Sequence, residues 1–288
     1  MLSRRRKDQV VLNWFEDRLN YEKSPFWEFL RCLAMLLVLR CCFKRIHWVR
    51  HNFAGHDRWA CRFRKILEWV LKHLATTRIT HRPLHGYTYL PHPLYPVDCS
   101  LQNERDIRFL YFGAIKSYKG LEELLQHWDP AVPMHMVGSG DDALQKRLRK
   151  IIEERALTVD WRQSFIPDAE LNQLLSRTQC VIIPHREASM IVSGAAYHAL
   201  SCGAQLLVRQ GSFATYLQGE LGDAVSVFNN ENLSQVLECF EYRAAEGARQ
   251  QVAASFGDEL LADGWRPLLE GGSKDQKKPP NSREVKRL

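Results

Sequence analysis

The chain has 288 residues, 45% hydrophobic and 25% charged, enough to bury the core of one large domain or of two moderate ones. Its net charge of +7 is uneven, because residues 1–96 hold 18 Lys or Arg against 7 Asp or Glu, a balance of +11. This basic front suits a membrane surface, a phosphorylated lipid or a nucleic acid, and equally a solvated surface without a partner. The eight cysteines form no CxxC pair, which argues against a disulfide scaffold and predicts reduced, mostly buried thiols in a cytoplasmic protein.

The front of the chain shows no signal peptide, because charges return before an apolar region of useful length has formed. Within residues 26–45 only Cys32–Leu39 is free of charge, and these eight residues cannot cross a bilayer, which needs about 20. The segment predicts a buried or interfacial helix over Trp27–Arg45, with Lys and Arg at its borders able to reach lipid headgroups.

Apolar, β-rich runs alternate with segments of helical spacing, such as 120–128 and 142–156, which predicts a mainly parallel sheet covered on both faces. The predicted strands lie at 10–14, 45–49, 87–91, 107–113, 134–138, 180–184, 204–208 and 224–228. Residues 91–106 are rich in proline and lack apolar periodicity, so we expect a linker there. This divides the chain into a domain over 1–100, a domain over 101–270 and a disordered tail over 271–288.

The first loop that could carry chemistry follows the strand at 107–113. Gly113 ends this strand, and Lys116 and Lys119 precede a helix. Glycine lets the backbone approach a ligand, a helix start offers free amides and the lysines add positive charge, so the loop suits a phosphate. A strand-to-helix turn with solvated lysines explains the same residues.

The second loop carries Gly138 and Gly140, between a strand and a helix that Asp141 or Asp142 can cap. It lacks the third glycine of a dinucleotide fingerprint, and no Gly-Lys-Ser or Gly-Lys-Thr step of a triphosphate loop is present. Taken alone, this pattern favours a turn over a nucleotide site.

The third loop follows the strand at 180–184. Arg186 and Glu187 are placed to meet sugar hydroxyls or a phosphate, and Ser193 and Gly194 open a run of small residues. Ser193 can cap a helix whose bare start leaves amides for an anion. Close packing of a helix on a sheet also requires small residues and is the alternative.

His51 directly follows the strand at 45–49. A histidine at a strand end can act as a general base or bind a sugar or phosphate, because its pKa lies near the working pH. A polar surface residue is the alternative. The front histidines do not form the two compact pairs of a metal site. Serine hydrolase and zinc protease motifs are absent, and no nucleic-acid fold pattern accompanies the basic start.

In chain order these pieces resemble GT-B fold glycosyltransferases, in particular the family 4-like enzymes of bacterial exopolysaccharide and lipopolysaccharide assembly. The matching stretches, between about residues 46 and 228, are WVRHNFAGH, YLPHPLY, FLYFGAIKSYKGLEELL, MVGSG, FIPDAELNQLLSRTQCVIIPH and SGAAYHALSCGAQLLV. The resemblance implies an α/β protein of two Rossmann-like domains, with the nucleotide sugar on the C-terminal domain and the acceptor on the N-terminal one. It implies neither a cofactor nor a bound metal.

The resemblance also implies roles for single residues. The donor-binding residues would be Gly113, Lys116, Lys119, Gly138, Arg186, Glu187, Ser193 and Gly194, and the catalytic residue would be His51. The lysines would pair with the donor diphosphate, where preorganised positive charge stabilises the leaving nucleoside diphosphate.

Two departures from the family pattern stand out. Many family 4 enzymes carry two glutamates eight positions apart, and these positions correspond here to Met190 and His198, with Glu187 out of register. In addition, roughly the first 50 residues of the usual N-terminal domain have no counterpart, so this domain is expected to be incomplete.

The sequence thus predicts a metal-independent hexosyltransferase that moves a hexose from a GDP- or UDP-sugar to a lipid-linked saccharide in surface polysaccharide biosynthesis. We expect it in the cytoplasm, without a nucleic-acid partner. It could bind there as a peripheral protein to the anionic inner face of the plasma membrane. The alternative is a non-catalytic binding or scaffolding protein derived from the GT-B fold, and nucleic-acid binding through the basic front is a third hypothesis.

Overall fold

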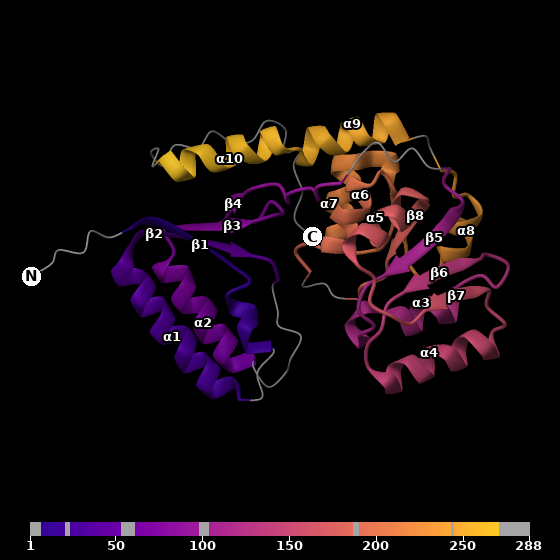
Figure 1. The fold of residues 1–288 in the computed structure, drawn as a ribbon, viewed down its shortest axis with the longest axis horizontal. Coiled ribbons are helices and arrows are strands. Elements are labelled where there is room, and N and C mark those ends of the chain that lie inside the picture. Colours follow the sequence, from indigo (N-terminus) through magenta and orange to yellow (C-terminus); the bar gives the residue numbers. More distant parts are fainter. Residues whose placement is uncertain are drawn as a thin grey trace, which may run out of the picture.

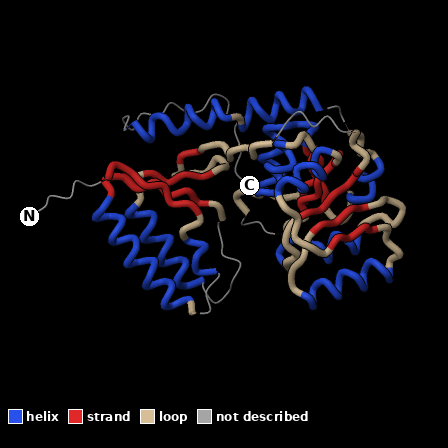
Figure 2. Tube along the Cα trace, in the orientation of Figure 1, coloured by secondary structure: helices blue, strands red, loops and turns tan. Residues whose placement is uncertain are grey.

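The computed structural model describes residues 7–20, 24–52, 61–97, 104–186, 190–242 and 245–270. These residues form two parallel β-sheets, each with helices packed on both faces (Figures 1 and 2). The expected α/β architecture of two Rossmann-like units is therefore confirmed. None of the helices in the described segments combines the length and hydropathy needed to cross a bilayer.

The first sheet has four parallel strands in the order β1-β2-β3-β4. They are β1 Lys7–Asn13, β2 Phe43–Arg50, β3 Thr77–Thr80 and β4 Thr88–Tyr89. The 3₁₀ helix η1 Glu16–Asn20 follows β1, and the long helices α1 Pro25–Cys42 and α2 Cys61–Leu74 cover one face (Figure 1). Alternate residues of β2 point to opposite faces of the sheet, so Trp48 packs against α1 and α2 whereas Val49 lies on the other side.

The second sheet has six parallel strands in the order β10-β9-β8-β5-β6-β7. They are β5 Ile107–Phe112, β6 Met134–Val137, β7 Val159–Arg162, β8 Thr178–Ile183, β9 Gln205–Arg209 and β10 Val225–Phe228. The inner strands are apolar on both sides because separate hydrophobic clusters bury each face.

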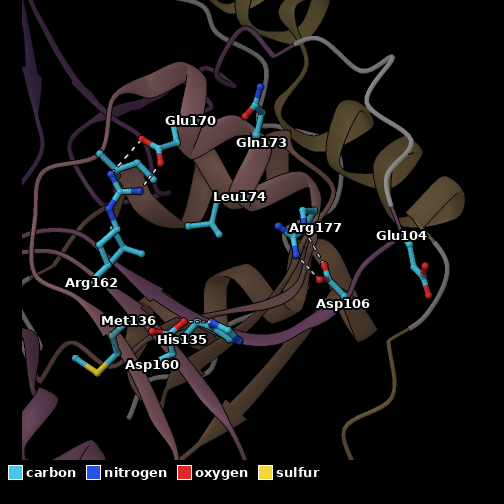
Figure 3. A pocket seen from close by; sticks show the side chains of 12 residues that line it. Glu104, Asp106, His135, Met136, Asp160, Arg162, Glu170, Gln173, Leu174 and Arg177 are labelled. Carbon is cyan, nitrogen blue, oxygen red and sulfur yellow. Dashed lines mark hydrogen bonds and ion pairs between the residues drawn. The ribbon is translucent and has the colours of Figure 1, made fainter.

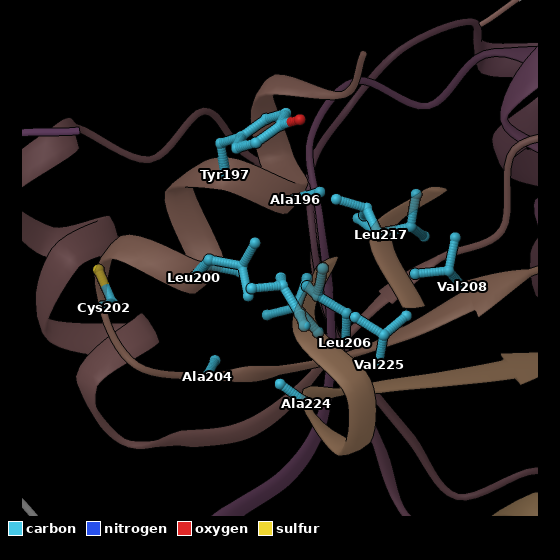
Figure 4. Packing of buried hydrophobic residues seen from close by; sticks show 14 of the residues in the cluster. Ala196, Tyr197, Leu200, Cys202, Ala204, Leu206, Val208, Leu217, Ala224 and Val225 are labelled. Carbon is cyan, nitrogen blue, oxygen red and sulfur yellow. The ribbon is translucent and has the colours of Figure 1, made fainter. Parts of the chain in front are cut away.

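Helices cover this sheet on both sides. One face carries α3 Leu121–His127, α4 Asp142–Glu154 and α8 Leu233–Glu238, and the other carries α5 Asp168–Ser176, α6 Gly194–Ser201 and α7 Ser212–Leu221. Short 3₁₀ helices lie at η2 Ser117–Lys119 and η3 Gly222–Ala224. Figure 4 shows Ala196, Leu200 and Leu217 gathered around Leu206, so the small residues of α6 do support close helix-to-sheet packing.

The strand order reverses between β5 and β8, since β6 and β7 continue from β5 on one side and β9 and β10 continue from β8 on the other. In open α/β sheets, ligands bind at such a switch point, beyond the carboxyl ends of the strands. The loops that follow β5 and β8 are the two loops for which the sequence predicts a phosphate.

The last two helices connect the sheets. Helix α9 Ala245–Phe256 packs on α6 and α7, and α10 Asp258–Glu270 extends over the first sheet (Figure 1). There Trp265 and Leu268 pack against Val49 and Leu90, on the face opposite α1 and α2. The chain thus returns to its N-terminal sheet after completing the second one.

Each of the eight predicted strands overlaps an observed strand, but β3 and β7 were not predicted. The helix predicted over Trp27–Arg45 ends at Cys42, because the next residues pair with β1 as the start of β2. The expectation of mostly buried cysteines was wrong for half of the six whose environment is described: Cys41, Cys42 and Cys239 are exposed.

Candidate active site

The loop after β5 begins at Gly113, whose φ is 121° and whose amide donates to the carbonyl of Val137 at 2.9 Å. A Cβ added at Gly113 would meet no atom within 4 Å, so there is open space beside this backbone. Three residues later, Lys116 has an extended backbone and is exposed to solvent. This combination leaves room for a ligand next to a cation.

Lys119 lies deeper than Lys116. Its Nζ is 2.5 Å from Nε2 of His185, in the loop after β8. Burial, and secondly the charge of Lys116, lower the pKa of Lys119 to about 8. The amide of Arg186 donates to the carbonyl of Tyr118 at 3.2 Å. The loops after β5 and β8 are therefore in direct contact, and Lys119 and Arg186 lie where they meet.

Glycines allow this close approach of loops. A Cβ on Gly138 would lie 1.9 Å from the carbonyl oxygen of Gly113, and a Cβ on Gly140 would lie 2.0 Å from that of Ile115. Gly120 has φ 70°, and a Cβ there would lie 2.4 Å from the carbonyl oxygen of Pro184. Packing accounts for Gly138, so its predicted contact with a donor stays a prediction.

Ser193 occupies the N-cap position of α6, but its side chain makes no capping hydrogen bond. Its carbonyl accepts from the amides of Ala196 at 3.0 Å and Tyr197 at 3.3 Å. Gly194 faces Tyr95, since a Cβ there would lie 2.9 Å from the phenol oxygen. The first amides of α6 thus remain uncapped by Ser193, which is compatible with the predicted anion contact.

A network of polar side chains beside Arg186 was not predicted. Glu123 accepts hydrogen bonds from Arg186 at 2.7 Å, from Arg209 at 3.3 Å and from the side chain of Asn230. The hydrogen bond from Asn230 and the charges of both arginines lower the pKa of Glu123. Arg209 ends β9, and its Nη2 is buried without a hydrogen-bond partner among the described residues. An arginine at the carboxyl end of an inner strand is the sequence signal that could have identified it. Glu187 lies outside the described residues.

His51 follows β2 and is only 4% exposed, covered by the ring of Trp14 at a centroid distance of 3.9 Å. Burial, and then the nearby His81 and His92, lower its pKa to about 3, so the imidazole is neutral at pH 7. Its Nδ1 has no hydrogen-bond partner in the described part of the chain.

The carboxyl ends of the two sheets meet at this histidine. The next residue, Asn52, forms an isolated antiparallel bridge with Met190, which belongs to the loop between β8 and α6. Arg82 donates to Oγ of Ser212 at 2.9 Å, in a second contact between the two halves. His51 therefore lies on the N-terminal side of the boundary, and the start of α6 lies on the C-terminal side.

The two positions that correspond to the family's glutamates are buried. Met190 is a core residue. His198 lies within 2.6 Å of Oδ1 of Asn172 and stacks under Tyr95. In this conformation both side chains serve packing.

A cavity of about 770 Å³ lies elsewhere, between α5, the strands β6 and β7 and the residues just before β5 (Figure 3). Its arginines are paired, Arg162 with Glu170 and Arg177 with Asp106, and Nδ1 of His135 lies 3.2 Å from Oδ2 of Asp160. None of the predicted site residues that the structure describes lines it. Among the described residues, no group of three or more His, Cys, Asp or Glu is arranged to hold a metal ion.

Two parallel α/β sheets whose carboxyl ends meet, joined by a final helix that returns to the first, define the GT-B fold of glycosyltransferases. Solved structures agree. Anabaena HepE in complex with UDP matches with a TM-score of 0.64 at 14% identity, over 91% of this chain and 79% of that one. The α,α-trehalose-phosphate synthase (UDP-forming) from Burkholderia xenovorans matches with a TM-score of 0.62 at 13% identity, over 89% and 81%. The GT-B fold that the sequence motifs imply is thereby confirmed.

Among proteins of assigned function, the chain is similar to GDP-mannose:glycolipid 4-beta-D-mannosyltransferase from Xanthomonas campestris pv. campestris. The two are 24% identical over 234 residues, which cover 75% of this chain and 65% of that protein. The chain thus spans somewhat less than two thirds of the relative's length. No family model matches the sequence.

Proposed function

We propose that this chain is a glycosyltransferase that moves a hexose from a nucleoside diphosphate sugar to a lipid-linked saccharide during surface polysaccharide biosynthesis. The observation that carries the proposal is the contact between the loops after β5 and β8 at the switch point of the second sheet. It brings Lys119 and Arg186 together on the sheet where GT-B proteins hold the donor.

In this proposal the donor diphosphate lies between Lys116, Lys119 and the uncapped start of α6. As the bond to the sugar breaks, negative charge gathers on the departing nucleoside diphosphate, and cations and amides already in position stabilise it. These groups supply the positive charge without a metal ion. GDP is the preferred nucleotide in the proposal because the related Xanthomonas protein uses GDP-mannose.

The role of His51 beside the reacting sugar carbon is also a proposal. In the described conformation Trp14 covers the imidazole, so contact between this ring and a sugar requires the indole to move. A non-catalytic binding protein is the second candidate, favoured by the buried Met190 and His198 at the positions of the missing acids.

We further propose that the protein works on the inner face of the plasma membrane and contacts it through the α1–α2 face, the outer surface of these helices. In α1 the apolar residues that are exposed recur at spacings of three and four, opposite the buried Phe29, Cys32 and Leu36. The exposed large apolar residues of the face are Phe26, Trp27, Leu30, Met35, Leu37, Val38, Ile66 and Trp69.

Charge favours an anionic bilayer as the occupant of the α1–α2 face. The exposed cations on these two helices are Arg31, Arg40, Arg62, Lys65 and Lys72. Their acidic residues, Glu28 and Glu68, are both buried and paired with arginines. An apolar surface rimmed by cations alone is typical of helices that lie in the plane of an anionic membrane.

Thermal unfolding in the presence of GDP, UDP and ADP tests the donor site. A nucleotide that binds only the folded state stabilises it by about 2.7 kcal/mol at one hundred times its Kd, a rise of several degrees in Tm. We expect this rise with GDP, and a much smaller one in Lys119→Met. Lys150→Met, an exposed lysine on α4, is the matched control and should respond like the wild type.

If no nucleotide raises the Tm of the wild type, the donor site does not exist. If GDP binds but no labelled mannose passes from GDP-mannose to extracted membrane lipids, the binding protein becomes the better assignment.

A further inference from the structure

Trp14 is strained and exposed at the end of β1. Its φ of 55° lies in the left-handed region, which side chains with a Cβ rarely adopt. Ala156, the other such residue among those described, follows the end of α4, where this conformation is common, but Trp14 follows a strand. Residues in such conformations cost about 1–3 kcal/mol and cluster at functional sites.

The surroundings of Trp14 hold its ring at the surface. The next three residues, Phe15, Glu16 and Asp17, are buried, whereas Trp14 is 48% exposed. Its ring is stacked on the buried His51 with an interplanar angle of 17°. One face of the indole is thus fixed against a neutral imidazole, and the exposed surface comes from the opposite face and the edges.

Trp14 also lies on the acceptor side of the proposed reaction site. From His51 a row of rings leads to the second half: His81 at 5.2 Å, then His92 at 5.0 Å from His81, then Tyr197 of α6 stacked at 4.2 Å from His92. The bridge between Asn52 and Met190 lies one residue after His51. Trp14 therefore stands on the N-terminal sheet, across the boundary from the start of α6.

We propose that Trp14 binds the saccharide acceptor, by stacking its exposed indole face on the C–H face of a pyranose ring. This inference rests on the proposed glycosyltransferase function and names the part of the site that holds the acceptor sugar. A pyranose presents a flat apolar face with hydroxyls at its rim, and the indole offers a matching apolar plane with an N–H donor at its edge. If Trp14 holds the acceptor, His51 is a positioning residue beneath the indole and does not itself contact the sugar, so this role replaces the direct contact proposed above.

Trp14→Gly separates a binding role from a structural one. Glycine adopts a φ of 55° without strain, so the variant should keep or raise the Tm while removing the platform. Saturation-transfer-difference NMR with octyl β-D-glucopyranoside, octyl α-D-mannopyranoside and octyl β-D-glucuronide, each below its micelle concentration, reports which ring protons touch the protein. We expect one face of at least one of these sugars to receive saturation from the wild type, and at least tenfold weaker binding in Trp14→Gly.

Conservative variants complete the test. Trp14→Phe and His51→Phe each keep a ring in place and should retain much of the binding, whereas His51→Ala should weaken it. The Tm rise caused by GDP should stay unchanged in all of these variants.

Two results would overturn the inference. One is the absence of ring-face saturation in the wild type with all three glycosides while GDP still binds. The other is unchanged glycoside binding in Trp14→Gly. Loss of the GDP response in the wild type, with glycoside binding intact, would instead remove the donor site and leave the platform in place.

Discussion

Lys119 combines burial, a neighbouring cation and a position at the contact between two loops. Burial disfavours the charged form of an amine, so the unliganded protein loses this charge as pH rises through about 8. A bound diphosphate favours the charged form and raises the pKa again. Above pH 8 binding must therefore take up a proton, and affinity falls.

We predict that the affinity for GDP is nearly constant below pH 8 and then drops by up to about tenfold per pH unit. Isothermal titration from pH 7 to 9.5 measures this directly. Lys119→Met should bind weakly with no such fall. In Lys116→Met the fall should begin at a higher pH, because the charge that helps to lower the pKa of Lys119 is gone. An identical pH profile in wild type and Lys119→Met would show that another group titrates.

At the scale of elements, glycines set how closely the loops at the switch point approach. Gly138→Ala places a Cβ 1.9 Å from a backbone oxygen of Gly113, and neither loop can yield without moving a strand end. We predict a loss of about 3 kcal/mol in the free energy of unfolding.

The matched control is Gly219→Ala within α7, where a Cβ meets nothing within 4 Å. Alanine is the better helix former by about 0.5–1 kcal/mol, so this variant should be slightly more stable. Urea unfolding of both variants measures the difference. A Gly138→Ala protein as stable as the wild type would mean that the two loops separate readily.

Most of the strands that could be predicted from the sequence contain an uninterrupted apolar or aromatic run. β3 and β7 were missed because charged or polar residues alternate with their few apolar ones, as in Thr77–Thr80 and Val159–Arg162. Loop order along the chain indicated Gly113, Lys119 and Ser193. Glu123, Arg209 and Asn230 were not found, because their contacts join residues 86 and 107 positions apart.

At the scale of the whole molecule, the two faces of the first sheet are covered by different helices. Helix α10 returns from the second half and buries Val49, Ile79 and Leu90 on one face (Figure 1). On the other face α1 and α2 bury the sheet but leave their own outer surface apolar, with Leu37 67% exposed and Trp69 61% exposed. A bilayer on the α1–α2 face would thus hold the first sheet next to the lipid-linked acceptor of the proposed reaction.

We predict that the protein sediments with vesicles of phosphatidylcholine and 30% phosphatidylglycerol, and much less with phosphatidylcholine alone. Each cation near an anionic surface contributes about 1 kcal/mol, so Arg62→Gln with Lys65→Gln should weaken binding about thirtyfold. Leu37→Gln with Val38→Gln should weaken it at every salt concentration, because the apolar contribution is not screened.

The control pair is Lys146→Gln with Lys150→Gln, two exposed lysines on α4 of the second half, which should sediment like the wild type. Equal losses in the control pair and in the Arg62 and Lys65 variant would mean that only total charge matters and would contradict a defined membrane face. If the wild type ignored the vesicles but formed dimers that Leu37→Gln with Val38→Gln dissolved, the α1–α2 face would belong to a second copy of the chain. Because the proposed GDP site lies on the other sheet, neither result would alter the donor proposal.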